Sequence, residues 1–295
     1  MGMNLGAAEA FMVAHARVLE RRRMRLLLGA GSPDEVLAAL DAYRNPDRGY
    51  GWALEPDLRS ATSQPVAAMH ALEVLAEVRD TTSARPVQLC DWLAEHTFPD
   101  GGVPLALPYP DTAGSAPLWA DADATVSSLQ MTAQLAAQAH RLARHRSDLA
   151  AHPWLAAATT YCLDAVDRIV EAPHPVELVF VMRFLDAVAD DVPRARRLLD
   201  RLAGFVVSDG PTPVAGGAAD EVLYLLDFTP YGDAPSRTLF AGSAVAADLD
   251  RLAGQQQPDG GWTVTFTSYS PAAALDWRGY ATVQAVSVLR GADRS

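Results

Sequence analysis

Apolar residues recur at helical spacing along almost the whole chain, in segments separated by Gly- and Pro-containing turns. Leu129, Ala133 and Ala136 illustrate the pattern, since residues three or four positions apart lie on one face of a helix. Alanine and leucine are abundant and runs of β-branched residues are scarce, which favours helix over strand. The pattern predicts helices at 5–28, 32–44, 63–78, 84–96, 122–144, 153–170, 175–189, 192–206, 218–227, 241–256 and 271–290.

One turn sequence occurs three times between these segments. Its copies are Pro46-Asp47-Arg48-Gly49, Pro99-Asp100-Gly101-Gly102 and Pro258-Asp259-Gly260-Gly261, and they start 53 and then 159 residues apart. The longer interval is three times the shorter one, so it has room for two degraded copies. A period of this size is typical of repeat architectures.

The helices therefore form hairpin repeats, and the second helix of each pair is apolar on several faces. A ring of inner helices surrounded by outer helices would bury both sets, and closure removes the exposed ends of an open solenoid. We predict an all-α fold, an α/α barrel (toroid) of helical hairpins, as one domain over residues 1–295. No linker is long and polar enough to indicate a domain boundary.

The last repeat resembles a known motif. Leu252 and Gln256, followed by Gln257-Pro258-Asp259-Gly260-Gly261-Trp262, look like the QW motif of squalene-hopene cyclases and related terpenoid cyclases. Weaker forms of these repeats occur in protein prenyltransferase β-subunits. The resemblance implies an α/α barrel, in which Gln256 bonds the ends of neighbouring helices and Trp262 packs on the turn.

A second resemblance concerns catalysis. Trp119-Ala120-Asp121-Ala122-Asp123-Ala124-Thr125 is similar to the Asp-x-Asp-Asp-Thr signature of class II terpene cyclases, with Ala124 in place of the third Asp. It implies that Asp123 is the general acid that protonates an alkene or epoxide and that Asp121 assists it. Burial and a neighbouring carboxylate can keep an Asp protonated. Alternatively, these residues only cap the helix that follows them.

Other residues at the predicted helix entrances would face the same cavity. Aromatic rings there would suit a carbocation, although such rings also simply fill cores. His70 lies within a predicted inner helix, where it would hydrogen-bond an acid or be structural. The predicted substrate-binding residues are Trp52, Glu55, His70, Trp119, Glu177, Tyr224, Asp276, Trp277 and Tyr280.

Composition restricts the class of protein. The net charge of −12 argues against nucleic-acid binding. No apolar stretch reaches the length of a membrane span, and the charged segment Glu20–Arg23 interrupts the N-terminal apolar residues too early for a signal peptide. The two cysteines, Cys90 and Cys162, form no CxxC, which favours a reducing cytoplasm. No metal or cofactor motif is present, and Arg21–Arg25 are interpreted as a solvated helix face.

These observations predict a class II-type terpene cyclase that acts on an apolar isoprenoid by protonation, without metal or cofactor. A single barrel needs its own loops, a second copy or another protein to close the cavity. A carbohydrate-active α/α-barrel enzyme remains an alternative, in which Glu55, Glu177 or Asp220 would partner Asp123. A non-catalytic repeat protein that binds a lipid or a partner is the other alternative.

Overall fold

The computed structural model describes residues 2–292, and it is almost entirely helical. A single short antiparallel pair, β1 (Thr212–Pro213) and β2 (Val222–Leu223), is the only sheet in this part of the chain. The all-α prediction is therefore confirmed. The helices are α1 (Leu5–His15), α2 (Val18–Leu27), α3 (Pro33–Leu40), α4 (Pro65–Glu77), α5 (Arg85–Glu95), α6 (Pro117–Ala120), α7 (Leu129–Ala143), α8 (Ser147–Ala150), α9 (Pro153–Asp167), α10 (Pro175–Val188), α11 (Pro193–Ala203), α12 (Leu225–Phe228), α13 (Gly242–Gly254) and α14 (Pro271–Ala292), with 3₁₀ turns at Asp41–Tyr43 and Pro235–Leu239.

Local sequence signals start most of these helices. Proline occupies the first turn of α3, α4, α5, α6, α9, α10 and α11, where its missing N–H costs nothing. Ser32 forms a capping box with Glu35 at the start of α3, and Ser128 caps α7 through the N–H of Met131. The starts of these helices are thus largely fixed by residues in or next to their first turn.

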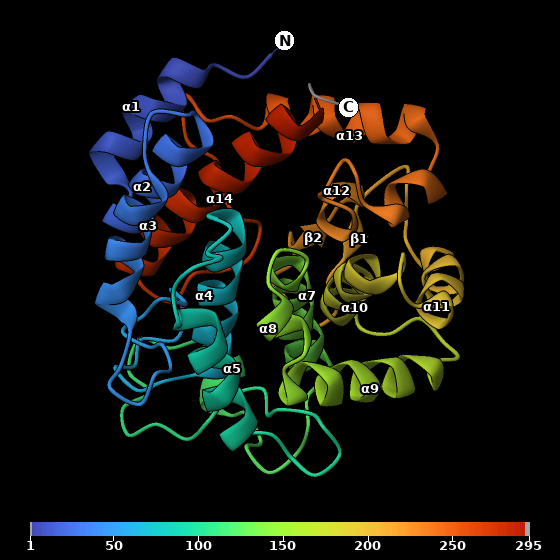
Figure 1. Ribbon diagram of the computed structural model, residues 1–295. Coiled ribbons are helices and arrows are strands. Elements are labelled where there is room, and N and C mark those ends of the chain that lie inside the picture. The colour runs from blue at the N-terminus through green and yellow to red at the C-terminus, as the bar shows by residue number, and fades with distance from the viewer. Residues whose placement is uncertain (1, 293–295) are drawn as a thin grey trace.

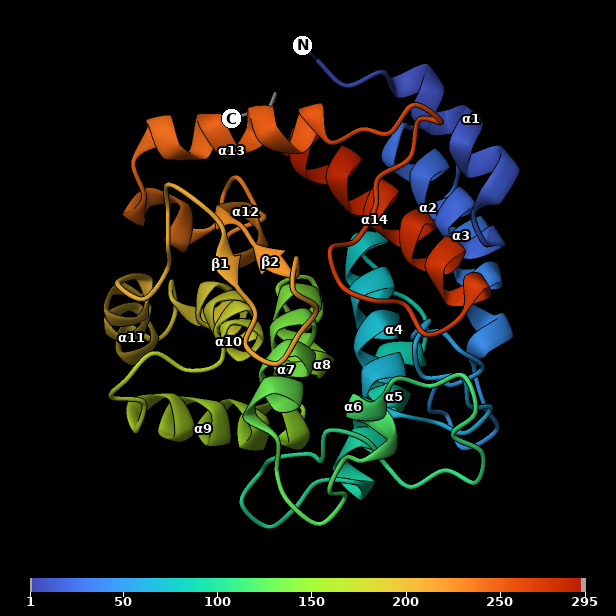
Figure 2. The ribbon, with the colours of Figure 1, turned by 180° about the vertical axis from the view of Figure 1, so that it is seen from behind.

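Helices α4, α7 and α10 lie side by side in the middle of the molecule, and the other long helices surround them (Figures 1 and 2). Helix α9 packs on α7, and α11 packs on α10. Helices α1 and α14 are in contact, so the two ends of the chain meet. The closed double ring of inner and outer helices stays a prediction.

The three repeated turns share one geometry. Asp47, Asp100 and Asp259 each accept a hydrogen bond from the backbone N–H two residues later, at 3.0, 3.0 and 3.2 Å. The third position of each turn has positive φ, at 77° for Arg48, 93° for Gly101 and 94° for Gly260. The shared sequence thus encodes a shared backbone, because Asp bonds its own turn and Gly tolerates the left-handed region.

The last turn joins the two ends of the chain. The Gln256 side chain accepts from the N–H of Asn4 at 2.7 Å and donates to the Asn4 carbonyl at 2.8 Å. The indole of Trp262 is buried and donates to the Leu252 carbonyl at 2.8 Å. Gln256 therefore ties the start of α1 to the end of α13, and both residues act structurally, as the sequence predicted.

Three predicted helices have clearly different bounds, namely 5–28, 218–227 and 122–144, which begins only at Leu129. The segment 5–28 is two helices, because Ala16 and Arg17 have extended backbones with ψ of 156° and 159°. The Arg17 side chain is held by the carbonyls of Ala53 and Leu54, at 2.9 and 3.2 Å, so a distant loop fixes the break. In the segment 218–227, the prediction of one helix is wrong: β2 occupies 222–223 and α12 begins only at Leu225.

Candidate functional site

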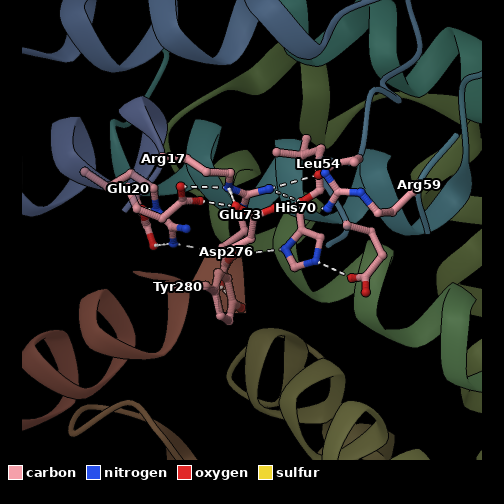
Figure 3. Close-up of polar contacts among 12 residues, drawn as sticks. Arg17, Glu20, Leu54, Arg59, His70, Glu73, Asp276 and Tyr280 are labelled. Atoms are coloured by element: carbon pink, nitrogen blue, oxygen red, sulfur yellow. Dashed lines mark hydrogen bonds and ion pairs between the residues drawn. The ribbon is translucent and has the colours of Figure 1, made fainter. Parts of the chain in front are cut away.

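Five of the predicted site residues meet in one place. Glu55, His70, Asp276, Trp277 and Tyr280 come from the loop 44–64 and from helices α4 and α14. Figure 3 shows His70, Glu73 and Tyr280 directed toward one another between these elements and α2. We call this group, together with Asp57, Glu73 and Arg23, the central cluster.

The loop 44–64 carries the acidic part of the central cluster into the interior. Trp52 and Ala53 have positive φ values of 56° and 57°, which turns the chain sharply before Glu55. Gly51 passes so close to the next arm of the loop that a Cβ there would lie 2.2 Å from the Thr62 carbonyl oxygen. Glu55 and Asp57 are consequently 3% and 4% exposed although they belong to a loop.

His70 lies between two carboxylates on the buried face of α4. Its Nε2 is 2.8 Å from Glu55 Oε2, and its Nδ1 is 3.7 Å from Glu73 Oε2. Burial disfavours the imidazolium, but the hydrogen bonds and charges of the two glutamates outweigh it and raise the pKa of His70 to about 9. His70 is thus a buried cation at neutral pH. The rings of Trp277 and Tyr280 stand edge-on to it, with centroids 6.1 and 5.3 Å away.

Glu73 is the most heavily bonded acid of the central cluster. It accepts hydrogen bonds from the Tyr280 hydroxyl at 3.0 Å and from the Gln284 amide at 2.7 Å, and Arg23 lies 3.4 Å away. Burial favours protonation, but the charges of Arg23 and His70 and hydrogen bonds from His70 and Tyr280 lower the pKa of Glu73 to about 2. Arg23 also forms a two-pronged pair with Glu77, at 2.6 and 2.8 Å. Glu73 is therefore ionised and links α2, α4 and α14.

Asp57 differs from the other acids because only neutral groups donate to its carboxylate. The indole N–H of Trp277 donates to Oδ2 at 2.7 Å, and the backbone N–H of Tyr269 donates to Oδ1 at 3.1 Å. Burial raises the pKa of Asp57 and prevails over these two hydrogen bonds. Phe266 packs edge-on against Trp277, with centroids 5.0 Å apart. Asp57 is thus a buried carboxyl group with a raised pKa whose hydrogen-bond donors are all neutral.

Ion pairs lie at the outer edge of the central cluster, and Asp276 takes part in one of them. Arg17 pairs with Glu20 at 2.7 Å, and Arg59 pairs with Asp276 at 3.1 Å (Figure 3). The side chains of Arg59 and Asp276 are 31% and 16% exposed, whereas those of His70 and Glu55 are 6% and 4% exposed. Asp276 is therefore the acid at the more exposed edge of the central cluster, and Glu55 lies in its interior.

The remaining predicted binding residues have other surroundings. Trp52 is 57% exposed and donates to Asn45 at 2.8 Å, so it stabilises the first repeated turn. Trp119 lies in the main hydrophobic core, and Glu177 lies in the first turn of α10. The guanidinium of Arg251 covers the ring of Tyr224 at 3.6 Å. None of the contacts described for these four residues reaches the central cluster.

The expected setting of Asp121 and Asp123 is wrong. Helix α7 begins at Leu129, so neither aspartate opens it, and both are exposed. Asp123 Oδ1 instead accepts from the N–H and hydroxyl of Thr125, at 2.8 and 2.6 Å, and these bonds lower its pKa. An exposed carboxylate with a lowered pKa has the opposite properties to those of an alkene-protonating acid.

Sequence reasoning missed Arg23, Glu73 and Gln284. The arginine-rich segment was interpreted as a solvated face, but Arg23 is only 3% exposed, because the facing glutamates of α4 compensate its charge. The available signal was helical spacing: Glu73 and Glu77 follow His70 at positions that share one face of α4. Within residues 2–292, no group of His, Cys, Asp and Glu is placed to hold a metal ion, and no helix there is long and apolar enough to cross a bilayer.

Comparison with known proteins bears on the fold. No protein-family model and no curated protein matches the sequence. Among solved structures, the chain is similar to a crystal structure described as that of a protein from Actinoplanes, with a TM-score of 0.52 and 16% sequence identity. The match covers 98% of this chain and 89% of that one. At this identity the likeness shows a common fold alone.

Proposed function

We propose that the protein is a class II-type isoprenoid cyclase in which Asp57, and not Asp123, donates the proton. The observation that carries the proposal is the contact between a buried carboxyl group with a raised pKa and an aromatic wall: Asp57 accepts a hydrogen bond from Trp277, which packs on Tyr280 and Phe266. The proposal includes the closed ring of helices expected for this family and a reducing compartment, in which the buried Cys90 and Cys162 stay free.

The other acids of the central cluster are less suited to the role. Glu73 is held ionised by Arg23 and His70, and Glu55 is engaged by the imidazolium of His70. Asp276 pairs with Arg59. Each of these three acids lies beside a cationic side chain, whereas Asp57 receives only neutral N–H donors.

Groups of the central cluster can donate and accept the protons that the proposed reaction requires. Asp57 transfers its proton to an alkene carbon, which forms a C–H bond and leaves a tertiary carbocation. A second alkene of the substrate attacks that cation and closes the ring. The faces of Trp277 and Tyr280 stabilise the positive charge. A carboxylate such as Glu55 then accepts a proton from the neighbouring carbon, and exchange with water restores the acid.

The test compares two aspartates in matched variants. Asp57→Asn keeps the shape and an acceptor for Trp277 but removes the transferable proton, so turnover should fall more than about 100-fold. Asp123→Asn changes an exposed residue and should leave turnover within about twofold. Both variants and the wild type are incubated with prenyl diphosphates and polyprenes, with and without EDTA, and cyclised products are measured by mass spectrometry.

Thermal unfolding of each variant checks that the fold is intact. Retained turnover in Asp57→Asn, loss of turnover in Asp123→Asn alone, or no cyclised product from the wild type with any substrate would contradict the proposal. Complete inhibition by EDTA would indicate metal-dependent chemistry instead.

A further inference from the structure

Arginines gather around a cavity that lies apart from the central cluster. This cavity of about 180 Å³ lies at the C-terminal ends of α4 and α7, beside α10 and the loop before the 3₁₀ turn Pro235–Leu239. A water molecule takes about 30 Å³, so the cavity has room for a small ligand. The basic residues that line it are Arg79, Arg141, Arg144, Arg183 and His145.

The four arginines are not paired with acids. Within residues 2–292, none of them has a carboxylate within ion-pair distance, in contrast to Arg23 or Arg194. Their partners are neutral. Arg141 donates to Gln138 and to the Tyr231 hydroxyl, at 2.9 and 2.6 Å, and Arg183 donates to the Asp227 carbonyl at 2.8 Å. Unpaired guanidinium groups around one cavity favour an anionic ligand.

Helix ends explain only part of this arrangement. The negative ends of helix dipoles attract cations, and Arg144 caps the end of α7. Arg183, however, lies more than a turn before the end of α10. Arg141 is only partly exposed and its guanidinium stacks on Tyr231 at 4.0 Å. The dipole at the end of α7 therefore accounts for Arg144 and Arg141, which lies in the last turn of that helix, but not for Arg183, which lines the same cavity.

The nearby acids leave the cavity positive. Asp186 and Asp233 are the acidic residues in its lining, against four guanidinium groups. Both oxygens of Asp186 already accept from Ser236, from its N–H at 2.7 Å and its hydroxyl at 2.5 Å. Glu73 and Glu77, whose charges also reach Arg141, are paired with Arg23. Among the lining residues, four guanidinium groups and two carboxylates leave an excess of two positive charges, in a chain whose net charge is −12.

We propose that this arginine pocket binds the phosphate group of a small phosphorylated ligand. A phosphomonoester carries between −1.5 and −2 charges at pH 7 and has three acceptor oxygens, which matches the excess charge and the several guanidinium forks. A single carboxylate would neutralise only half of that charge. The inference does not rest on the proposed cyclase activity, because it depends on none of the acid–base residues of the central cluster.

The experiment is isothermal titration of the full chain with inorganic phosphate and methyl phosphate at constant ionic strength, with succinate as a dicarboxylate control. The wild type should bind one phosphate saturably and succinate at least about tenfold more weakly. Arg144→Gln removes an exposed arginine of the lining and should weaken phosphate binding about tenfold. Asp233→Asn removes a lining negative charge and should strengthen it.

A variant at the surface and a variant in the central cluster serve as controls for phosphate binding. Arg194→Gln changes an exposed arginine outside the pocket, paired with Asp164, and should bind as the wild type does. Asp57→Asn should also bind phosphate normally, which separates this inference from the proposed reaction. The absence of saturable phosphate binding, equal binding of succinate, or an unchanged affinity in Arg144→Gln would each overturn the proposal.

Discussion

At the scale of single residues, the charge on His70 is the feature with the clearest consequence. Two glutamates hold the imidazolium inside the protein and raise its pKa to about 9, against 6.5 for a free histidine. The folded state thus keeps a proton that the unfolded chain releases between these pH values. Since the folded state binds more protons there, stability falls as pH rises.

We therefore expect the contribution of His70 to the free energy of unfolding to be complete below pH 6.5. This contribution should decline as the pH rises toward 9. The shift corresponds to roughly 3 kcal/mol. In His70→Gln the decline should be absent. Urea unfolding at pH 6 and pH 9.5, for wild type and variant, measures the difference directly.

His140 supplies the control. Burial and the nearby Arg144 lower the pKa of His140 to about 4, so it is neutral throughout this interval. His140→Gln should leave the decline between pH 6.5 and 9 unchanged. A wild-type profile that is flat there, or one that His140→Gln flattens, would show that His70 does not hold the proton.

At the scale of elements, the repeated turns act as joints between helices. In the last turn, Gly260 has a φ of 94° and lies against the backbone of α1, where an added Cβ would be 2.1 Å from the Ala7 carbonyl oxygen. Any other residue there would strain the backbone, because φ is positive. Its Cβ would also clash with the Ala7 carbonyl oxygen, a backbone atom that cannot move by itself. This turn therefore tolerates only glycine at its third position, whereas the first turn accepts Arg48 there.

Gly260→Ala should lower the free energy of unfolding by about 3 kcal/mol or more, because strain and overpacking add. Gly254→Ala is the matched control, since a Cβ at this position of α13 meets no atom within 4 Å. It should be neutral or stabilise by about 0.5 kcal/mol. Chemical denaturation compares the two, and equal stabilities would contradict the close approach of the turn to α1.

At the scale of the whole molecule, two hydrophobic cores hold the helices. The main core runs through α3, α4, α5, α7, α9, α10 and α11. A second core joins the two ends of the chain, and its buried members include Phe11, Met24, Trp262 and Val286. Polar contacts link the two parts, because Glu73 of α4 binds Tyr280 and Gln284 of α14. Regions with separate cores can open separately.

Two phenylalanine variants test this division. Phe11→Ala and Phe184→Ala each remove a fully buried ring and should cost about 3–5 kcal/mol locally. In Phe11→Ala, amide hydrogen exchange should accelerate in α1 and α14 while α7 and α10 stay protected. In Phe184→Ala, protection should fall throughout the main core. The same exchange pattern in both variants would mean that the molecule unfolds as one unit.

Much of the fold followed from the sequence because its causes are local. Prolines and caps set the starts of most helices, and the Asp side chains of the repeated turns bond their own backbone two residues on. The break at Arg17 did not follow, because its cause is the loop carbonyls of Ala53 and Leu54. The start of α7 at Leu129 was missed although Ser128, its cap, is a local signal.

The sequence by itself determined an all-α chain with three copies of one turn motif, and it identified Glu55, His70, Trp277 and Tyr280 as residues of interest. Only the tertiary structure decided which acids are buried together and which are exposed. Tyr280 meets Glu73 across 207 residues, and Asp123 faces solvent while Asp57 is buried. The physical reason is that helices and turns depend on neighbours along the chain, whereas a pKa depends on desolvation and on charges that approach through space.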